Sequence, residues 1–230
     1  MTDFGKLYDS KILSADQAVE SIPRKANVAF GLGPSNPPAL LSALARRVEA
    51  RELDRVHLFY QLAHEAAKPL FKTQYLDRIS FHPNFLSYVD RAFMKEAGSN
   101  SVVDFLPSYL WQLPRVFSEF NHMNVFMITV SPMDKHGYFS LGTSCDYSST
   151  VAGDCDMLMV EVNKHMPRVF GENLVHVSQV HSIVENDVPL IQLLDKPATA
   201  KDIKIGAMIA ELVPDGACLQ FGIGSIPNSV

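Results

Sequence analysis

Short apolar runs alternate along this chain with segments whose apolar residues recur at helical spacing. A run that is apolar throughout is typical of a strand buried on both faces of a parallel sheet. Such runs predict strands at residues 27–30, 56–62, 79–81, 124–130 and 157–162. Helical spacing predicts helices at residues 14–22, where Ser14 and Asp16 form the cap, 37–49, 89–97 and 111–117. We therefore expect an α/β fold, a mostly parallel sheet with helices on both faces.

The chain also matches itself. Residues 17–34, QAVESIPRKANVAFGLGP, align with residues 208–225, MIAELVPDGACLQFGIGS, and six of the 18 positions are identical. The identities include a proline and both glycines of a GxG sequence, whose backbone roles are specific. The repeat predicts that a helix, a turn, a strand and a glycine loop open each of two similar halves. Residues 28–39 and 219–229 should then share one strand–loop–helix geometry.

The second of these halves begins within the 230 residues but is not completed. We therefore expect the chain to be the N-terminal portion of a larger protein and the first of two duplicated halves. The polar, proline-containing stretch 194–199 predicts the boundary between them. The predicted domains are an α/β domain at residues 1–195 and the truncated start of a similar domain at residues 196–230.

Composition and charge exclude several classes of protein. With 47% hydrophobic and 20% charged residues the chain should fold around an ordinary core. A formal net charge of -5 and the lack of a basic run disfavour a nucleic-acid partner. No apolar run approaches the ~20 residues that span a bilayer, and the N-terminus lacks a secretory signal pattern, so we expect no membrane partner. Cys145, Cys155 and Cys218 are odd in number and scattered, which predicts reduced cysteines in a cytoplasmic protein.

The two GxG sequences, which start at Gly31 and Gly222, end predicted strands and precede predicted helices. Backbone N–H groups at such a point suit an anion or a developing oxyanion. A dinucleotide site would need glycine where Asn36 and Pro227 stand, so NAD binding is disfavoured. A tight turn without a ligand is the alternative, and the duplication favours a functional loop.

The loop after residues 124–130 carries Ser131, Asp134 and His136, residue types that serine hydrolases use. Ser144 is a second candidate nucleophile. The sequence around Ser144 does not match G-x-S-x-G, and the members of a triad converge in space rather than crowd one loop. A turn built by Asp134 and Gly137 is the favoured interpretation.

The remaining polar candidates are histidines and one glutamate. His57 and His64, like His176 and His181, lack the spacing of a helical metal site, so no metal is predicted. Glu161 ends an apolar run and could be a catalytic carboxylate. An acid that caps a loop at a strand terminus is the favoured interpretation of Glu161.

Several segments taken together carry a family resemblance. These are residues 31–40, 104–107, 113–114, 130–132, 136–142, 161–163, 166–168, 176–178, 219–224 and 226–227. On these segments the chain resembles, over nearly its whole length, the N-terminal half of the acetyl-CoA hydrolase/transferase family. It looks most similar to the 4-hydroxybutyrate or butyrate/acetate CoA-transferase branch.

The resemblance implies two related α/β domains and ping-pong transfer of CoA, through a glutamyl-CoA thioester, from an acyl-CoA to a short-chain carboxylic acid. It implies a homo-oligomer, with the CoA thioester as substrate and no permanently bound cofactor. The nucleophilic glutamate is expected beyond Val230, so residues 1–230 alone are not expected to transfer CoA. Consequently none of Glu161, Glu172, Glu185 and Glu211 is assigned that role.

The resemblance also implies site residues. Gln220, Gly222 and Gly224 are expected to contact the CoA ester or its oxyanion. The equivalent first loop offers Gly31, Gly33 and Ser35 as candidates for the substrate pocket. Two alternatives stay open at this point: an acetyl-CoA hydrolase, and a non-catalytic subunit that binds CoA esters.

Overall fold

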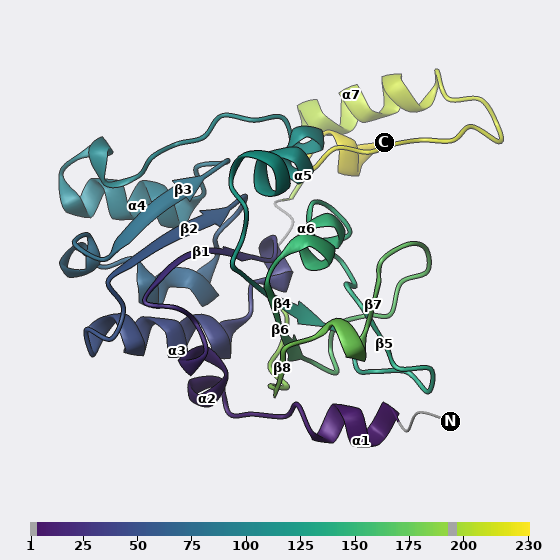
Figure 1. The fold of residues 1–230 in the computed structure, drawn as a ribbon. Helices are drawn as coiled ribbons and strands as arrows, with labels where there is room; N and C mark the ends of the chain where they lie inside the picture. The colour runs from purple at the N-terminus through teal and green to yellow at the C-terminus, as the bar shows by residue number, and fades with distance from the viewer. Residues whose placement is uncertain (1–3, 193–196) are drawn as a thin grey trace. The chain divides into compact units, whose positions relative to one another are not determined.

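The computed structural model describes residues 4–192 and 197–230, which form two compact units (Figure 1). The first unit, Met1–Ile191, contains the sheet, and the second is Gln192–Val230. The predicted boundary at 194–199 begins in residues that lie outside the described part of the chain.

Six parallel strands form the sheet of the first unit, in the order β3-β2-β1-β4-β6-β8. Their bounds are β1 (Lys25–Phe30), β2 (Arg55–Tyr60), β3 (Ile79–Pro83), β4 (Val125–Val130), β6 (Met157–Val162) and β8 (Ser182–Glu185). Every residue of β4 is buried, as its continuous apolar run predicts. The predicted parallel α/β sheet is thus confirmed.

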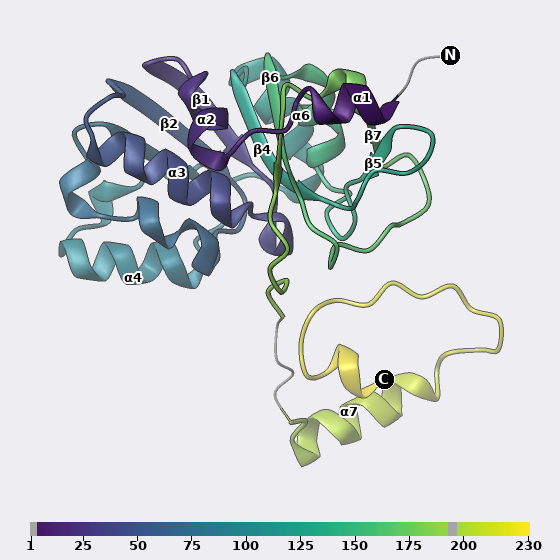
Figure 2. The same cartoon turned by 90° about the horizontal axis from the view of Figure 1, so that it is seen from below.

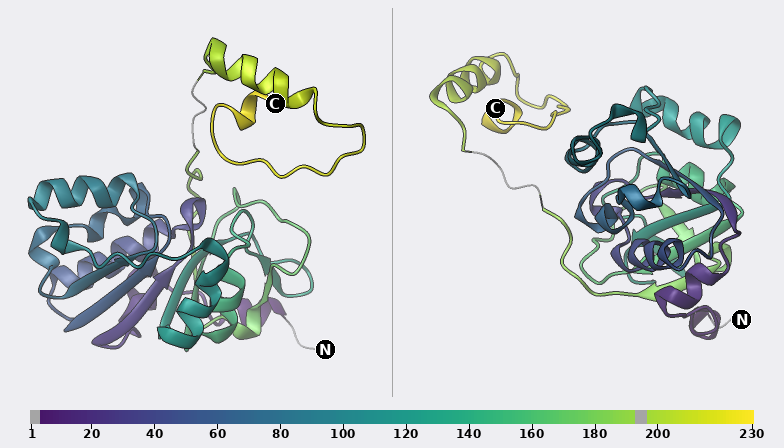
Figure 3. Two further views of the ribbon diagram at one scale, coloured as in Figure 1. Left: turned by 90° about the horizontal axis from the view of Figure 1, so that it is seen from above. Right: turned by 90° about the vertical axis from the view of Figure 1, so that its left-hand side faces the viewer.

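Helices cover both faces of this sheet (Figures 2 and 3). Val28 and Phe30 of β1 pack into a core shared with α2 (Ala15–Glu20), α3 (Pro38–Glu49) and α4 (Tyr88–Ala97). Ala29, which points the opposite way because side chains alternate along a strand, joins the other core. That second core includes residues of α5 (Leu113–Arg115), η6 (Val116–Phe120) and α6 (Ser148–Asp154), with α1 (Phe4–Asp9) packed against it.

Local sequence fixes several helix ends. Ser14 caps α2 by accepting a hydrogen bond from the backbone N–H of Gln17, whose side chain accepts one from the N–H of Ser14 in return. Asp16 takes no part in this cap and instead pairs with Arg46 at 2.6 Å. The helix α4 ends at Gly98, whose φ of 65° is left-handed.

Some elements differ from the prediction. Residues 111–117 form no single helix but parts of η5 (Leu110–Gln112), α5 and the π-helical η6, and Pro114 supplies no backbone N–H there. The antiparallel pair β5 (Tyr138–Ser140) and β7 (Leu174–His176) was not predicted, nor were β8, α1 and α6. The first unit also contains short 3₁₀ helices: η1 (Gly33–Ser35), η2 (Glu65–Leu70), η3 (Thr73–Tyr75), η4 (Asn100–Val102) and η7 (Val177–Gln179). A strand of three residues is too short to show a recognisable alternation of apolar and polar residues in the sequence.

The second unit contains α7 (Ala200–Ala210) and η8 (Pro227–Ser229). Residues 219–221, which the repeat predicted as a strand, are irregular. The prediction that residues 28–39 and 219–229 share one geometry is therefore wrong for this structure. The physical reason is that a strand needs a neighbour to pair with, and the second unit supplies none among its described residues.

Candidate active site at the sheet edge

The connections between the strands leave the sheet in opposite directions at one point of its carboxyl edge, between β1 and β4. The chain runs from β1 to β2 and β3 on one side, and then returns to β4 on the other side of β1. All six strands end at the same edge because they are parallel, and the connections diverge between β1 and β4. Open α/β sheets bind ligands in the crevice at such a point.

The first glycine loop lies at this point, directly after β1. A side chain at Gly31 would not fit, because an ideal Cβ there lies 2.6 Å from the carbonyl oxygen of Ser35 and 2.8 Å from Cγ1 of Ile128. Gly33 has a left-handed φ of 54°, which favours glycine. Of the three pocket candidates in this loop, Gly31 and Ser35 are packed against each other, and a Cβ at Gly33 would lie 3.9 Å from Cδ2 and Nε2 of His64.

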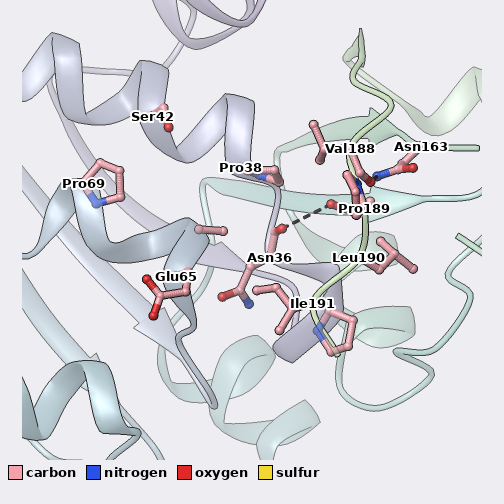
Figure 4. A pocket seen from close by; sticks show the side chains of 13 residues that line it. Asn36, Pro38, Ser42, Glu65, Pro69, Asn163, Val188, Pro189, Leu190 and Ile191 are labelled. Carbon is pink, nitrogen blue, oxygen red and sulfur yellow. Dashed lines mark hydrogen bonds between the residues drawn. The ribbon is translucent and has the colours of Figure 1, made fainter. Parts of the chain in front are cut away.

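A pocket of about 390 Å³ opens beside this loop (Figure 4). Its walls come from the first glycine loop, the start of α3, η2, the ends of β4 and β6, and the segment after β8. The lining residues are Pro34, Asn36, Pro38, Ser42, Glu65, Ala66, Pro69, Thr129, Asn163, Val188, Pro189, Leu190 and Ile191. Most are apolar and a few are polar, a composition typical of small-molecule sites. No spacing in the sequence connects this set, because its members come from separate segments of the chain.

Asn36 holds the loop in place. Its side-chain amide donates to the carbonyl oxygen of Gly31 at 2.5 Å, and its Oδ1 accepts from the backbone N–H of His64 at 3.0 Å. Thr129 of β4 donates from its hydroxyl to the Asn36 carbonyl at 3.3 Å (Figure 4). The loop is thus tied to residues at the ends of β1, β2 and β4.

Glu161 lies beneath the loop and supports the helix that follows it. Its Oε2 accepts from the backbone N–H groups of Ala39 and Leu40 at 2.9 and 3.1 Å, and its Oε1 accepts from Nδ2 of Asn186 at 2.6 Å. The side chain is fully buried, and burial raises its pKa to about 7 against the opposing effect of these hydrogen bonds. The contacts fit the structural interpretation, because the carboxylate satisfies N–H groups at the start of α3.

Two buried polar atoms near the loop have no partner among the described residues. They are the hydroxyl oxygen of Ser35 and Oε1 of Gln61, which follows β2. A buried polar group without a partner costs about 1–3 kcal/mol, so such atoms call for an explanation. Neither residue is among those that line the pocket.

The second glycine segment has different surroundings. Gln220 and Gly222 are exposed and help line an apolar hollow of about 220 Å³ in the second unit, with Pro227 and Val230 among its walls. Gly224 has a φ of 146°, so Gly33 and Gly224 both have a positive φ. The roles of Gln220, Gly222 and Gly224 toward a CoA ester stay predictions.

The loop after β4 is a turn. Oδ1 of Asp134 accepts from the backbone N–H groups of His136 and Tyr138 at 2.8 and 2.9 Å, and Arg168 pairs with the same carboxylate. The hydroxyl of Ser131 donates to the carbonyl of Pro132, not to His136. Ser144 likewise donates to a backbone carbonyl, that of Leu32 at 3.0 Å. These contacts support the turn rather than a triad.

Two of the histidines considered for metal binding have other side chains as partners. Nδ1 of His57 lies 3.0 Å from Nε2 of His82 on the neighbouring strand, whereas Nδ1 of His176 pairs with the hydroxyl of Ser178. Across residues 4–192 and 197–230, no group of three or more His, Cys, Asp and Glu side chains is placed to hold a metal ion. The same residues include no helix with the length and apolar character that crossing a membrane requires.

The sequence of the chain is similar to those of proteins named as CoA transferases. The chain is 34% identical, over 99% of its length, to the succinyl-CoA:cyclohexane-1-carboxylate CoA transferase of Geobacter metallireducens, and this match covers 50% of the relative. It is 31% identical, again over 99%, to the 4-hydroxybutyrate coenzyme A transferase of Clostridium kluyveri, covering 52% of that protein. The chain thus spans about half the length of the curated relatives it matches.

Solved structures and a family model give the same result. The crystal structure of RipA from Yersinia pestis superposes with a TM-score of 0.94 at 40% identity, covering 99% of this chain and 54% of RipA. A model of the acetyl-CoA hydrolase/transferase N-terminal domain matches residues 2–195. The resemblance seen in the sequence is thereby confirmed, and the chain belongs to the acetyl-CoA hydrolase/transferase family.

Proposed function

We propose that the natural full-length protein is an acyl-CoA:carboxylate CoA-transferase of the 4-hydroxybutyrate, butyrate or acetate type. The observation that carries the proposal is the match of 99% of the chain to proteins named as CoA transferases, at 31% and 34% identity. The pocket beside the first glycine loop supports it, because an apolar wall with a few polar groups suits an acyl chain that ends in a carboxylate. Acyl-CoA and a short-chain carboxylic acid are the substrates.

The proposed mechanism has two half-reactions through one enzyme glutamate. In the first, the glutamate carboxylate attacks the thioester carbonyl and CoA is then transferred to the glutamate, so the donor acid leaves with one glutamate oxygen. In the second, the acceptor carboxylate takes CoA from the glutamyl thioester and returns one of its own oxygens. Backbone N–H groups of a glycine loop stabilise the oxyanions of such steps. Gln220, Gly222 and Gly224 are the residues proposed for this contact.

We propose that the nucleophilic glutamate lies outside residues 1–230. Glu161 does not suit the role, because its carboxylate is fully buried and occupied by three hydrogen bonds. Residues 1–195 would form the N-terminal domain, and residues 196–230 would begin a second one. The second unit supports this division, since Leu212 and Ile223 are 82% and 93% exposed, as expected for side chains that further residues cover. Homo-oligomer formation and a cytoplasmic location stay predictions.

An acceptor screen tests the proposed function. The natural full-length protein is incubated with acetyl-CoA and a panel of short carboxylic acids, and new acyl-CoA species are followed by mass. A transferase produces a new acyl-CoA only when its acid is present. Free CoA formed equally well without any acid would instead identify the hydrolase that the family description includes. Binding of acetyl-CoA without turnover would identify a non-catalytic subunit.

A further inference from the structure

Large apolar side chains lie on the surface of the first unit between β3 and α5. Tyr109 and Trp111 are 71% and 73% exposed, and Phe105 and Leu110 are 46% and 52% exposed. The rings of Tyr109 and Trp111 lie nearly parallel, with their centroids 6.4 Å apart. We call these four side chains the aromatic patch. Exposed apolar patches on soluble proteins mark interaction sites.

The backbone that carries the aromatic patch is fixed to the rest of the first unit. The N–H of Asp104 donates to the carbonyl oxygen of Phe81 in β3 at 2.8 Å, and the N–H of Leu106 donates to that of Pro83 at 2.9 Å. After the patch, Leu113 is fully buried in the second core. The segment thus presents apolar side chains both to the core and to solvent. Such a segment is typical of one that protein covers on both sides.

A hollow of about 400 Å³ lies within the aromatic patch. It is lined by uncharged residues, which are Asn84, Phe105, Pro107, Ser108, Tyr109 and Gln112. Aromatic residues are enriched at the centres of protein–protein interfaces, whereas Lys, Glu and Asp are depleted there. An apolar side chain of another protein surface therefore suits this hollow better than a charged ligand.

The lengths of the relatives indicate which protein surface this is. The family model that matches residues 2–195 is that of an N-terminal domain, and the chain covers 50% and 54% of two matched proteins. In a protein of that length, a second half follows the matched part. A tethered half acts at a high effective concentration, about millimolar for a short flexible linker, so it outcompetes a second copy of the chain.

We propose that the aromatic patch is the surface of the first unit on which the second half of the natural full-length protein docks, with an apolar side chain of that half in the hollow. The proposal rests on the proposed full-length protein of two halves and not on the reaction that it catalyses. Tyr109 and Trp111 are the main contacts, because buried Tyr and Trp side chains carry much of the binding energy of interfaces.

Photo-crosslinking in the natural full-length protein tests the docking surface. Tyr109 is replaced by p-benzoylphenylalanine, and exposed Glu96 of α4 is replaced in the same way as the control. Labelled and unlabelled proteins are mixed, so that peptide masses separate crosslinks within one polypeptide from those between two copies. We expect position 109 to crosslink to residues after 230 of the same polypeptide, well above the control. Crosslinks mainly between copies, or none above the control, would overturn the proposal.

Thermal unfolding of one variant in two contexts gives a second test. Trp111→Lys should lower the Tm of the natural full-length protein by about 5 °C, because it places a charge in the docked surface. It should leave the Tm of the 230-residue chain unchanged, where Trp111 is exposed. Trp111→Phe keeps an aromatic ring and should retain most of the full-length Tm. An unchanged Tm in full-length Trp111→Lys, or an equal loss in both contexts, would contradict docking.

These outcomes are independent of the proposed reaction. A full-length protein that transfers no CoA would refute the proposed function, and the crosslinks from position 109 would still decide whether the second half docks on the aromatic patch.

Discussion

Gly31 and Gly222 occupy matching places in the repeat, yet Gly31 is buried and Gly222 is exposed. The first glycine loop follows a strand paired on both sides, and Asn36 ties it to Gly31 and His64. In the second segment Pro227 stands where Asn36 would be, and the described residues 217–221 just before the glycines form no strand. The same local sequence pattern thus adopts two geometries. In the first loop, pairing of β1 with its neighbouring strands and the buried side-chain amide of Asn36 fix the backbone conformation.

The largest expected contrast comes from adding one methyl group to each glycine. Gly31→Ala places Cβ within 2.6 Å of a backbone oxygen, so it should lower the free energy of unfolding by about 3 kcal/mol. Gly222→Ala meets nothing closer than Pro227 Cγ at 3.8 Å, so its effect should stay within about 0.5 kcal/mol. Urea unfolding of the 230-residue chain measures both. Equal effects would mean that the two loops are equally crowded.

Removal of the buried amide comes next. Asn36→Ala deletes the bonds to Gly31 and His64 and leaves a buried carbonyl and N–H without partners, so it should cost about 2 kcal/mol. Gln220→Ala removes an exposed amide of the second segment and serves as the control, with little expected change. Thermal or urea unfolding compares the two. An Asn36→Ala variant as stable as the Gln220→Ala control would show that the Asn36 amide does not stabilise the loop.

The smallest effect concerns pH. The pKa of Glu161 is raised from 4.5 to about 7, so the folded state binds a proton that the unfolded state lacks between these values. Stability from this group is therefore present at low pH and is lost as pH rises through 7. Between pH 6 and pH 7 the wild type should lose about 1 kcal/mol relative to Glu161→Gln. A pH-independent difference between wild type and Glu161→Gln would contradict the raised pKa.

Much of the sheet was predictable because its strands are apolar throughout. The run at 124–130 predicts a buried strand, and β4 is buried at each residue. The short strands β5 and β7 were missed, since three residues hold their form only through pairing with each other. The predicted strand at 219–221 failed for the same reason, because its pattern is local but strand pairing is not.

The candidate site was less predictable than the fold. The GxG pattern indicated where the first loop lies, and Pro34 and Asn36 of this loop line the pocket. His64 was considered only as a metal ligand, because its burial and its backbone hydrogen bond to Asn36 depend on contacts that the sequence does not reveal. Thr129 and Asn163 line the pocket from separate strands, so no spacing in the chain connects them.

Transfer of oxygen between the two acids tests the central claim most directly. The natural full-length protein is given acetyl-CoA and butyrate labelled with ¹⁸O in its carboxylate, and the released acetate is analysed by mass. CoA transfer through one enzyme glutamate predicts butyryl-CoA together with acetate that gains ¹⁸O from butyrate over successive turnovers. Acetate that carries only solvent oxygen, with free CoA and no butyryl-CoA, would contradict the account.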